Sequence, residues 1–452
     1  MGLKIALVIA ILLALGSPGP VPAADPPLTL AETMLLALKE NPGLKAAGFT
    51  VETAEADMAR ARARFLPQIN FGENFTYSDN PSVVFSNKLN QRVFQQQDFL
   101  LDNLNHPQPY GNFRTGLSLS QPLFQAGEAY LGYQQAQLGR EIAAAQVLGQ
   151  RQQVLFQVTQ AYFGLQLAQE KEGVMTRARE TAAAHLKVVQ ARYDAGAVVK
   201  ADVLSAQVNL ARLTQEAMTA RSQVQIGWSA LETAVGVKGL GARPLSAAPQ
   251  EAAPLPPRLE DLQEEGKSKR PDLKRLTLAA QIAQQETTKA RLNYLPRLRV
   301  VAEYDVDQRR LFGSSGDSYT VMALMNFNLF NGLADLARVR ESRAREAQAR
   351  EFKRELEDRI RHQVTESILN LKTAHERLKV ARAAVDQARE GLRLIRLRYQ
   401  EGLTILVDLL TAENALKDAE LSRVAALFDT HLAQAGLELA LGTLAGPAPE
   451  QR

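Results

Sequence analysis

Two similar stretches decide the fold: ARYDAGAVVKADV at residues 191–203 and LRYQEGLTILVDL at residues 397–409. Both contain Arg-Tyr-x-x-Gly with an Asp six residues after the Gly, and the offset between them is 206 residues. Glycine is common just past the end of a helix, where the backbone turns left-handed. The repetition therefore predicts two helical hairpins of the same design. The turn glycines are Gly196 and Gly402, and the acids near the start of the returning helices are Asp202 and Asp408.

The whole chain is a tandem duplication around these turns. Nearer the N-terminus of each repeat, Phe65-Leu66-Pro67 recurs as Tyr294-Leu295-Pro296 at an offset of 229, so the first repeat carries 23 extra residues between Pro67 and Leu123. Each repeat is predicted to contain a helix, strands, a very long helix and a returning helix. We expect a first structural repeat over 24–238, a Gly/Ala/Pro-rich connector over 239–257, a second repeat over 258–446 and a C-terminal tail over 447–452.

The composition excludes several classes of protein. The 452 residues include no Cys, which excludes disulfides, thiolate zinc sites and cysteine nucleophiles. The formal net charge of +4 is too small for the length to indicate a nucleic-acid binder. The five His are scattered, and there is no phosphate loop or G-x-S-x-G motif. We therefore predict no enzymatic activity, no cofactor, no metal and no nucleic-acid partner.

Residues 1–23 have the features of a secretory signal peptide. An apolar run of 11 residues from Ile5 to Leu15 follows Lys4, and Val21-Pro22-Ala23 offers small residues for cleavage. A membrane anchor helix is the alternative, but the run is shorter than the ~20 residues that span a bilayer. We expect an exported protein without a transmembrane helix.

Proline placement predicts helices of unusual length. No proline occurs from 123 to 243 or from 297 to 446, and a proline inside a helix costs about 3 kcal/mol. Apolar residues between Leu371 and Tyr399 alternate at spacings of three and four, which is typical of a coiled-coil seam. We expect long helices over 126–195 and 332–401, and returning helices over 200–238 and 404–443.

Between the helices the apolar period changes to two. Ile69, Phe71, Phe75 and Tyr77 alternate with polar residues, and similar stretches occur near 113–120, 298–307 and 319–327. Segments of about 10 residues with one apolar and one polar face are typical of strands in a membrane barrel. We expect β-hairpins over 67–124 and 296–330. Four strands of a soluble sandwich are the alternative, although they would bury little beside such long helices.

The strand count has a consequence for assembly. A membrane barrel begins at about eight strands, and an open sheet edge in lipid leaves backbone groups unpaired. If these strands span a membrane, several chains must therefore share one barrel. The loop over 79–110 holds the extra residues and would face the outside of the cell. There it would pack over the pore, touch envelope polymer or form a plain surface loop.

The acids near the turns have two interpretations. Asp202 and Asp408 either satisfy only free N–H groups at the helix starts, or form a ring of carboxylates in a rotational oligomer. Such a ring selects cations and repels anions. Tyr399 and Asp202 are candidates for a hydrogen bond between neighbouring turns that holds an entrance shut.

Together and in this duplicated order, these residues resemble the TolC family of outer-membrane efflux proteins. The resemblance covers nearly the whole mature chain. It includes Leu28-Thr29-Leu30 with Ala31-Glu32 and Asn41-Pro42, the two strand junctions at Pro67 and Pro296, and the two Tyr-x-x-Gly-x-x-x-x-x-Asp turns. It implies a mainly α fold with a membrane β-barrel part, in a homotrimer in the outer membrane of a Gram-negative bacterium. Four transmembrane strands per chain would share one twelve-stranded barrel in contact with lipid, above a periplasmic tunnel of long antiparallel coiled-coil helices.

The resemblance also implies partners and residue roles. A periplasmic adaptor (membrane fusion) protein would dock at the tunnel tip, and an inner-membrane pump, RND-type or ABC-type, would supply energy. Asp408 would line the periplasmic entrance, and Tyr399 with Asp202 would form part of the closed-state lock. The chain has Thr404 and Thr411 where the best-known member has a locking Arg and a second acid, which implies a lock that is weaker or built differently. The adaptor-docking turns would contain Gly196, Ala197, Gly402 and Leu403.

The implied function is a passive duct of a tripartite efflux or type I secretion system. A non-conducting trimeric coiled-coil envelope spacer or adhesin stalk is the alternative. Such a spacer would need neither four strands of membrane-spanning length nor a duplicated acid at the turn. The sequence does not name the cargo, drug, metal or protein, because the pump sets it.

Overall fold

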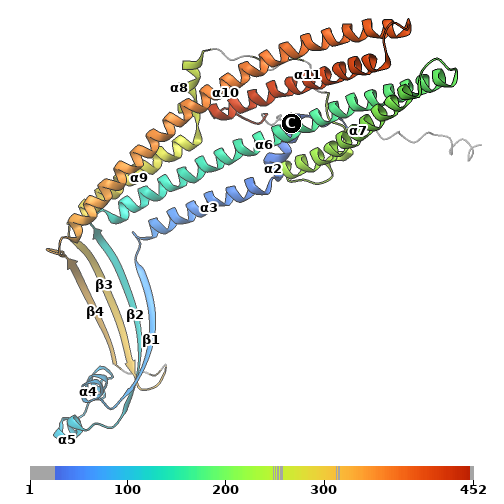
Figure 1. Cartoon of the computed structure of the whole chain (residues 1–452). Coiled ribbons are helices and arrows are strands. Elements are labelled where there is room, and N and C mark those ends of the chain that lie inside the picture. The colour runs from blue at the N-terminus through green and yellow to red at the C-terminus, as the bar shows by residue number, and fades with distance from the viewer. Residues whose placement is uncertain are drawn as a thin grey trace, which may run out of the picture. The chain divides into compact units, whose positions relative to one another are not determined.

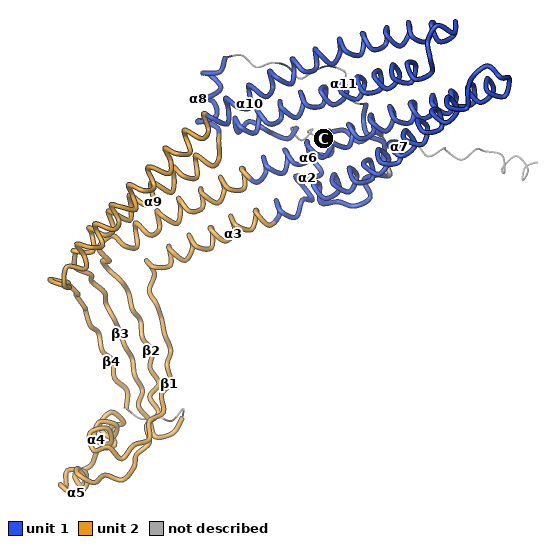
Figure 2. Tube along the Cα trace, viewed as in Figure 1, with its two compact units in different colours: residues 1–45, 150–269, 362–452 blue, residues 46–149, 270–361 orange. Residues whose placement is uncertain are grey.

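The computed structural model describes residues 26–447 except 248, 250, 252–253, 255–257, 312 and 314–315. The expected signal peptide, part of the connector and residues 448–452 lie outside the described residues. The chain divides into two compact units (Figure 2), and each takes segments from both sequence repeats. Unit 1 consists of residues 1–45, 150–269 and 362–452, and unit 2 of residues 46–149 and 270–361.

Unit 2 contains one antiparallel sheet of four strands in the order β1-β2-β3-β4 (Figure 1). Each repeat supplies one β-hairpin, and the pairing of β2 with β3 joins the two β-hairpins into one sheet. Within the described chain, β1 and β4 each have one edge without a partner strand. The strands are β1 (Gln68–Ser78), β2 (Tyr110–Gln125), β3 (Arg297–Gln308) and β4 (Gly316–Asn326).

The register places most of the large apolar residues of the four strands on one face. Phe71 pairs with Leu117, Leu117 with Tyr304, and Tyr304 with Tyr319. Side chains alternate between faces along a strand, so the polar residues between them share the other face. On that face the Arg114 guanidinium lies 2.6 Å from the Asp305 carboxylate. The alternation predicted from the sequence is therefore present as a mainly apolar face opposite a mainly polar one. The exceptions are Glu73 and Thr115 on the first face and Val301, Met322 and Leu324 on the second.

The segment over 79–110 folds against the strand ends. It contains α4 (Pro81–Asn90), the short 3-10 helix η1 (Gln96–Phe99) and α5 (Leu101–Asn105). The Gln91 amide donates to Asn112 Oδ1 at 2.7 Å, and the Asn112 amide donates to Asp307 Oδ1 at 2.5 Å. All three side chains are buried. Because Asn112 and Asp307 lie on the polar face, this segment covers the end of that face.

Each repeat begins with two helices where one was expected. They are α2 (Leu30–Glu40) and α3 (Pro42–Ala63) in the first repeat, and α8 (Leu259–Lys269) and α9 (Pro271–Leu292) in the second. The break falls at the duplicated proline, which fits the first turn of a helix but not its interior. Asn41 fixes the first break, because its Oδ1 accepts from Leu44 N at 3.0 Å and its amide donates to Ala234 O at 2.8 Å.

The long helices are α6 (Glu128–Asp194) and α10 (Ala334–Gln400), with 67 residues each. The returning helices are α7 (Lys200–Val235) and α11 (Leu406–Leu441), with 36 residues each. In unit 1, α6 lies beside α7 and α10 beside α11 (Figure 1). We call residues 150–235 hairpin 1 and residues 362–441 hairpin 2. Among the described residues, no helix is both long and apolar enough to span a membrane.

A large buried cluster of unit 1 lies far from the turns along the chain. Leu28, Val158, Leu165, Leu231 and Val235 are part of it. The buried Tyr162 hydroxyl donates to Leu28 O at 2.9 Å and lies 2.7 Å from Ser246 Oγ. This cluster therefore fixes the N-terminal segment and the start of the connector to hairpin 1.

Candidate functional site

The two turns have the same backbone geometry. Gly196 and Gly402 have φ of +74° and +71°. Ala197 N donates to Arg192 O at 2.8 Å, and Leu403 N donates to Arg398 O at 2.8 Å. These are the bonds of a Schellman motif, in which glycine supplies the left-handed residue. A Cβ at either glycine would meet nothing within 4 Å, so the positive φ alone favours glycine there.

The acids that follow the turns have different surroundings. Asp202 and Asp408 each lie in the first turn of the returning helix. The Thr404 hydroxyl donates to the Asp408 carboxylate, so this threonine binds the acid of its own turn. Thr411 donates instead to Val407 O at 2.8 Å. Asp202 is half-buried, and Asp408 is exposed.

Tyr399 packs between the two hairpins. It lies against a cluster of Val189, Val203, Ala206, Leu406 and Leu410 that draws on both. The Arg192 guanidinium lies 5.2 Å from the centre of the Tyr399 ring, within the range of a cation–π contact. The described contacts of Tyr399 include no hydrogen bond to Asp202, so their pairing in an assembled lock stays a prediction.

A carboxylate layer lies next to this cluster. Glu413 Oε1 on α11 lies 3.2 Å from His185 Nε2 on α6 and 3.5 Å from an Arg396 nitrogen on α10. The Glu413 side chain is only 14% exposed. The His185 contact is an ion pair only when the imidazole is protonated. Glu413 therefore lies where hairpin 2 meets hairpin 1, and among the described residues its Oε1 has no hydrogen-bond partner.

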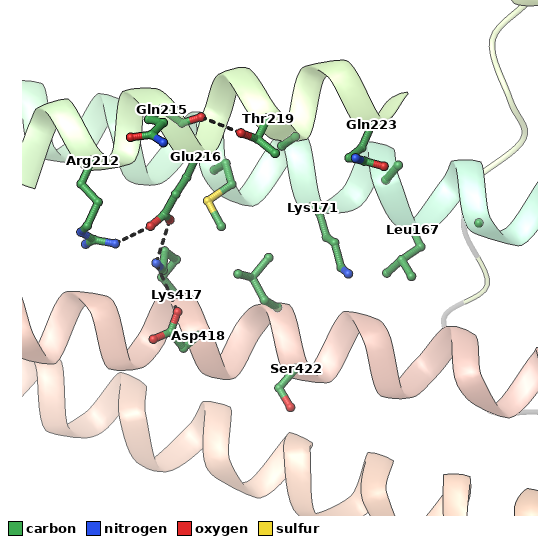
Figure 3. Close-up of a pocket in the computed structure, with 15 residues that line it drawn as sticks. Leu167, Lys171, Arg212, Gln215, Glu216, Thr219, Gln223, Lys417, Asp418 and Ser422 are labelled. Atoms are coloured by element: carbon green, nitrogen blue, oxygen red, sulfur yellow. Dashed lines mark hydrogen bonds and ion pairs between the residues drawn. The ribbon is translucent and has the colours of Figure 1, made fainter. Parts of the chain in front are cut away.

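A second layer surrounds Glu216 on α7 (Figure 3). Its carboxylate lies 2.6 Å from Arg212 and 3.0 Å from Lys417 Nζ on α11. Arg212 also donates to Asn414 Oδ1 on α11 at 2.6 Å. Burial alone raises the pKa of Glu216, but Lys417 and Arg212 stabilise the charged form more strongly, so its pKa lies below the ordinary value.

A groove of about 950 Å³ runs beside the second layer, between α6, α7 and α11. Leu167 and Lys171 point toward it from α6, and Ser422 lies on its α11 side (Figure 3). In the part of the chain that the structure describes, no group of three or more His, Asp and Glu could hold a metal ion. The side chains of this region thus form contacts between helices, and none is arranged as a metal site.

Sequence reasoning selected the turn residues but missed Arg192, His185 and the residues of both carboxylate layers. Arg212 with Glu216, and Glu413 with Lys417, are pairs at a spacing of four, which lie on one face of a helix. Charged pairs of this kind beside an apolar seam could have indicated a polar contact between helices. The spacing alone does not show which other helix the charged pairs face.

Comparisons with known proteins agree with this architecture. The family model described as Outer membrane efflux protein matches residues 34–237 and 262–443. No curated protein matches the chain. A membrane protein from Pseudomonas aeruginosa has a similar structure, with a TM-score of 0.78, 19% identity and coverage of 91% of this chain and 93% of that one.

Two named channels are also similar in structure. The CmeC outer membrane channel of Campylobacter jejuni has a TM-score of 0.78 and 17% identity, and the match covers 92% of this chain and 85% of that chain. The open state of the MtrE outer membrane channel of Neisseria gonorrhoeae has a TM-score of 0.73 and 18% identity, with coverage of 91% and 88%. At these identities the likeness is one of fold.

Proposed function

The chain belongs to the outer membrane efflux protein family, and from that membership we propose that it forms the passive duct of a tripartite efflux or type I secretion system. Proteins of this family are channels and not enzymes. An efflux channel role follows from the family, and the outer membrane of a Gram-negative bacterium is its expected location. The tripartite partnership is the further step that we propose.

One observation carries the proposal most directly: the four-stranded sheet with an apolar face and two free edges. Four strands cannot close in lipid, and unpaired backbone groups there cost several kcal/mol each. Pairing β1 of one chain with β4 of the next removes both edges. Three chains would give a barrel of twelve strands, with the apolar faces toward lipid and the polar faces toward water.

The hairpins supply the periplasmic part of the duct. In a trimer, three copies of hairpin 1 and hairpin 2 alternate around the axis and form the tunnel. Asp408 lines the entrance as a ring of carboxylates, with Tyr399 and Asp202 in the lock. The turns at Gly196, Ala197, Gly402 and Leu403 dock the adaptor, and an RND-type or ABC-type pump delivers the cargo.

A matched pair of substitutions tests the membrane assignment. Phe71→Lys places a charge on the apolar face of β1, and Asn70→Lys places the same charge on the polar face of the same strand. A lysine facing lipid near the bilayer midplane costs about 2–4 kcal/mol. We expect Phe71→Lys to reduce the amount of assembled protein in the outer-membrane fraction, and Asn70→Lys to leave it near the unsubstituted level. Equal amounts of both variants would contradict the assignment.

Single-channel recording separates the duct from a non-conducting spacer. The chain, purified from membranes as an intact oligomer, is added to a planar lipid bilayer. Discrete conductance steps are expected for a duct. Intact oligomers that insert without any conductance would favour the spacer or adhesin stalk.

Photocrosslinking tests the docking turns. A photoreactive residue at Ala197 or Leu403 is activated in cells, and the captured protein is identified by mass spectrometry. Capture of the adaptor of a proton-driven pump indicates small-molecule or metal efflux, and capture of the adaptor of an ATP-driven exporter indicates protein secretion. Capture of neither by a conducting oligomer would move the docking site away from the turns.

A further inference from the structure

The polar face of the sheet carries opposite charges at its two ends. Alternate residues of β3 share this face, and its charged members are Arg297, Arg299, Glu303, Asp305 and Asp307. Arg299 and Glu303 are separated by about 13 Å along the strand, at about 3.3 Å per residue. This separation exceeds the Debye length of about 8 Å at physiological ionic strength. The acids farther along β3 therefore do not neutralise the two arginines.

A cavity of about 500 Å³ lies at the arginine end of this face, within unit 2. Three guanidinium groups line the cavity, from Arg64 directly after α3 and from Arg297 and Arg299 at the start of β3. Glu128, in the first turn of α6, is the one acid among the described residues that line it. Three cations and one acid give the lining a net charge of +2.

The pairing of these groups leaves the excess charge available. The Glu128 carboxylate lies 3.2 Å from Arg297 and 3.8 Å from Arg64. A guanidinium group has five N–H donors, so one shared carboxylate cannot occupy both groups. Within the described part of the chain, Arg299 makes no hydrogen bond or ion pair. Arg299 is therefore the cation of this cavity that has no protein partner.

Neutral hydrogen-bonding side chains surround the arginines. In the strand register, Gln125 and Asn326 pair with Arg297 from its two sides. Gln68 and Ser120 pair with each other farther along the same face, and both line the cavity. As far as the structure describes the chain, these four neutral side chains make no hydrogen bonds. The cavity thus has unpaired donors next to its excess positive charge.

A carboxylate or a phosphate group matches this combination of side chains. A guanidinium group binds either anion through two parallel N–H donors, and such charge-assisted bonds are about twice as strong as neutral ones. The amides and the hydroxyl can donate to the remaining oxygen atoms of the anion. A cation would be repelled by three arginines, and an apolar ligand would leave the donors without partners.

We propose that the cavity lined by Arg64, Arg297 and Arg299 binds the carboxylate or phosphate group of a substrate that moves through the duct. The proposal rests on the trimeric duct proposed above, in which the polar face lines the water-filled interior. Three copies of the cavity then form a ring at the end of the barrel next to the tunnel. The acids farther along β3 repel the same anion, so the ring is where an anionic substrate pauses.

Block of the conductance by a polycarboxylate tests the site in the purified oligomer. Citrate is added to a planar bilayer in potassium chloride without divalent cations, and the concentration that halves the single-channel conductance is determined. Glucose, which has a similar size and no charge, is the control compound. Citrate is expected to reduce the conductance at concentrations at which glucose has no effect.

Substitutions on one face of the sheet show whether the cavity is responsible. Arg299→Gln removes the arginine without a protein partner, and Asn326→Asp adds a negative charge beside Arg297. Each should raise the half-blocking concentration of citrate at least fivefold. Arg114→Gln is the matched control, because it removes the same charge from the same face near the acids. It should change the half-blocking concentration less than twofold.

Three outcomes would overturn the proposal. Citrate may fail to block the unsubstituted channel, or Arg299→Gln and Arg114→Gln may weaken the block equally, so that overall charge explains it. The third outcome concerns a phospholipid head group as the source of the phosphate. It is a loss of anionic phospholipid from purified Arg299→Gln, measured by mass spectrometry, with an unchanged citrate block. The proposed function fails differently, because then the unsubstituted oligomer does not conduct even without citrate.

Discussion

The close packing at the end of α7 makes Gly236→Ala the most informative single substitution for the fold. Gly236 ends α7 with φ of +85°. An added Cβ would lie 2.6 Å from Pro42 Cδ, 3.0 Å from Asn41 Cα and 3.2 Å from Glu40 O. Two of these three atoms are backbone, so relief requires the break between α2 and α3 to shift. Gly239 is a matched control, because its φ is +81° and a Cβ there would meet nothing within 4 Å.

The two substitutions share one cost and differ in another. The left-handed conformation costs a residue with a Cβ about 1–2 kcal/mol, and both alanines incur it. Forcing a methyl group into packed surroundings adds about 1–3 kcal/mol, and only Gly236→Ala incurs that. A chain of 452 residues that unfolds as one unit loses about 1 °C of melting temperature per kcal/mol. Gly236→Ala should therefore melt about 1–3 °C below Gly239→Ala.

Far-UV circular dichroism of the detergent-purified protein, heated at one fixed rate, measures this difference. The fixed rate matters because large proteins often unfold irreversibly. If both variants lose the same few degrees, the contact between the end of α7 and the Asn41-Pro42 break does not support the fold. A melting temperature of Gly236→Ala above that of the unsubstituted chain would contradict the close approach of Gly236 to Pro42 and Asn41.

Three further predictions concern single side chains. Tyr162→Phe, which removes the buried hydroxyl, should cost about 1–3 kcal/mol, whereas Tyr130→Phe on the exposed part of α6 should change the melting temperature little. Glu216 has a lowered pKa in the folded chain, so its stabilisation is complete above the ordinary carboxyl pKa and is lost as the pH falls through the lowered pKa. The melting-temperature difference between the unsubstituted chain and Glu216→Gln should therefore shrink toward zero in acid. Asp408→Asn should lower the cation preference roughly twofold or more in a reversal-potential measurement, and Asp202→Asn should lower it less because Asp202 is half-buried.

The backbone plan was predictable because it depends on local rules. The proline-free stretches permitted long helices, and α6 and α10 each have 67 residues. Alternation with period two placed Phe71 and Tyr304 on one face of the sheet, and the register agrees. The turn at Gly196 could be predicted because glycine is common just past the end of a helix. In each case the residues that carry the information are close together in the sequence.

Contacts between distant segments were less predictable. The stacking of the Arg192 guanidinium on the Tyr399 ring was not anticipated from the sequence, and the expected bond between Tyr399 and Asp202 in an assembled entrance stays a prediction. Periodicity shows which face of a helix is apolar, but not which side chain of another helix that face meets. The segment over 79–110 also has no regular spacing of apolar residues from which its helices could be predicted. Its buried hydrogen bond from Gln91 to Asn112 forms only because the segment folds against the end of β2.

The change at Thr404 bears on how the entrance is closed. An arginine there would reach across to a neighbouring turn, whereas Thr404 is short and donates to Asp408 in its own turn. The proposed lock at the turns therefore lacks this longer side chain. Within one chain, the Glu216 carboxylate forms an ion pair with Lys417 between the two hairpins, and Glu413 lies 3.2 Å from His185, which is an ion pair only when the imidazole is protonated. In the proposed trimer, a cation introduced by Thr404→Arg should reach an acid of a neighbouring turn and should lower the frequency of channel opening. An unchanged frequency, with the protein intact, would mean that closure does not depend on contacts between neighbouring turns.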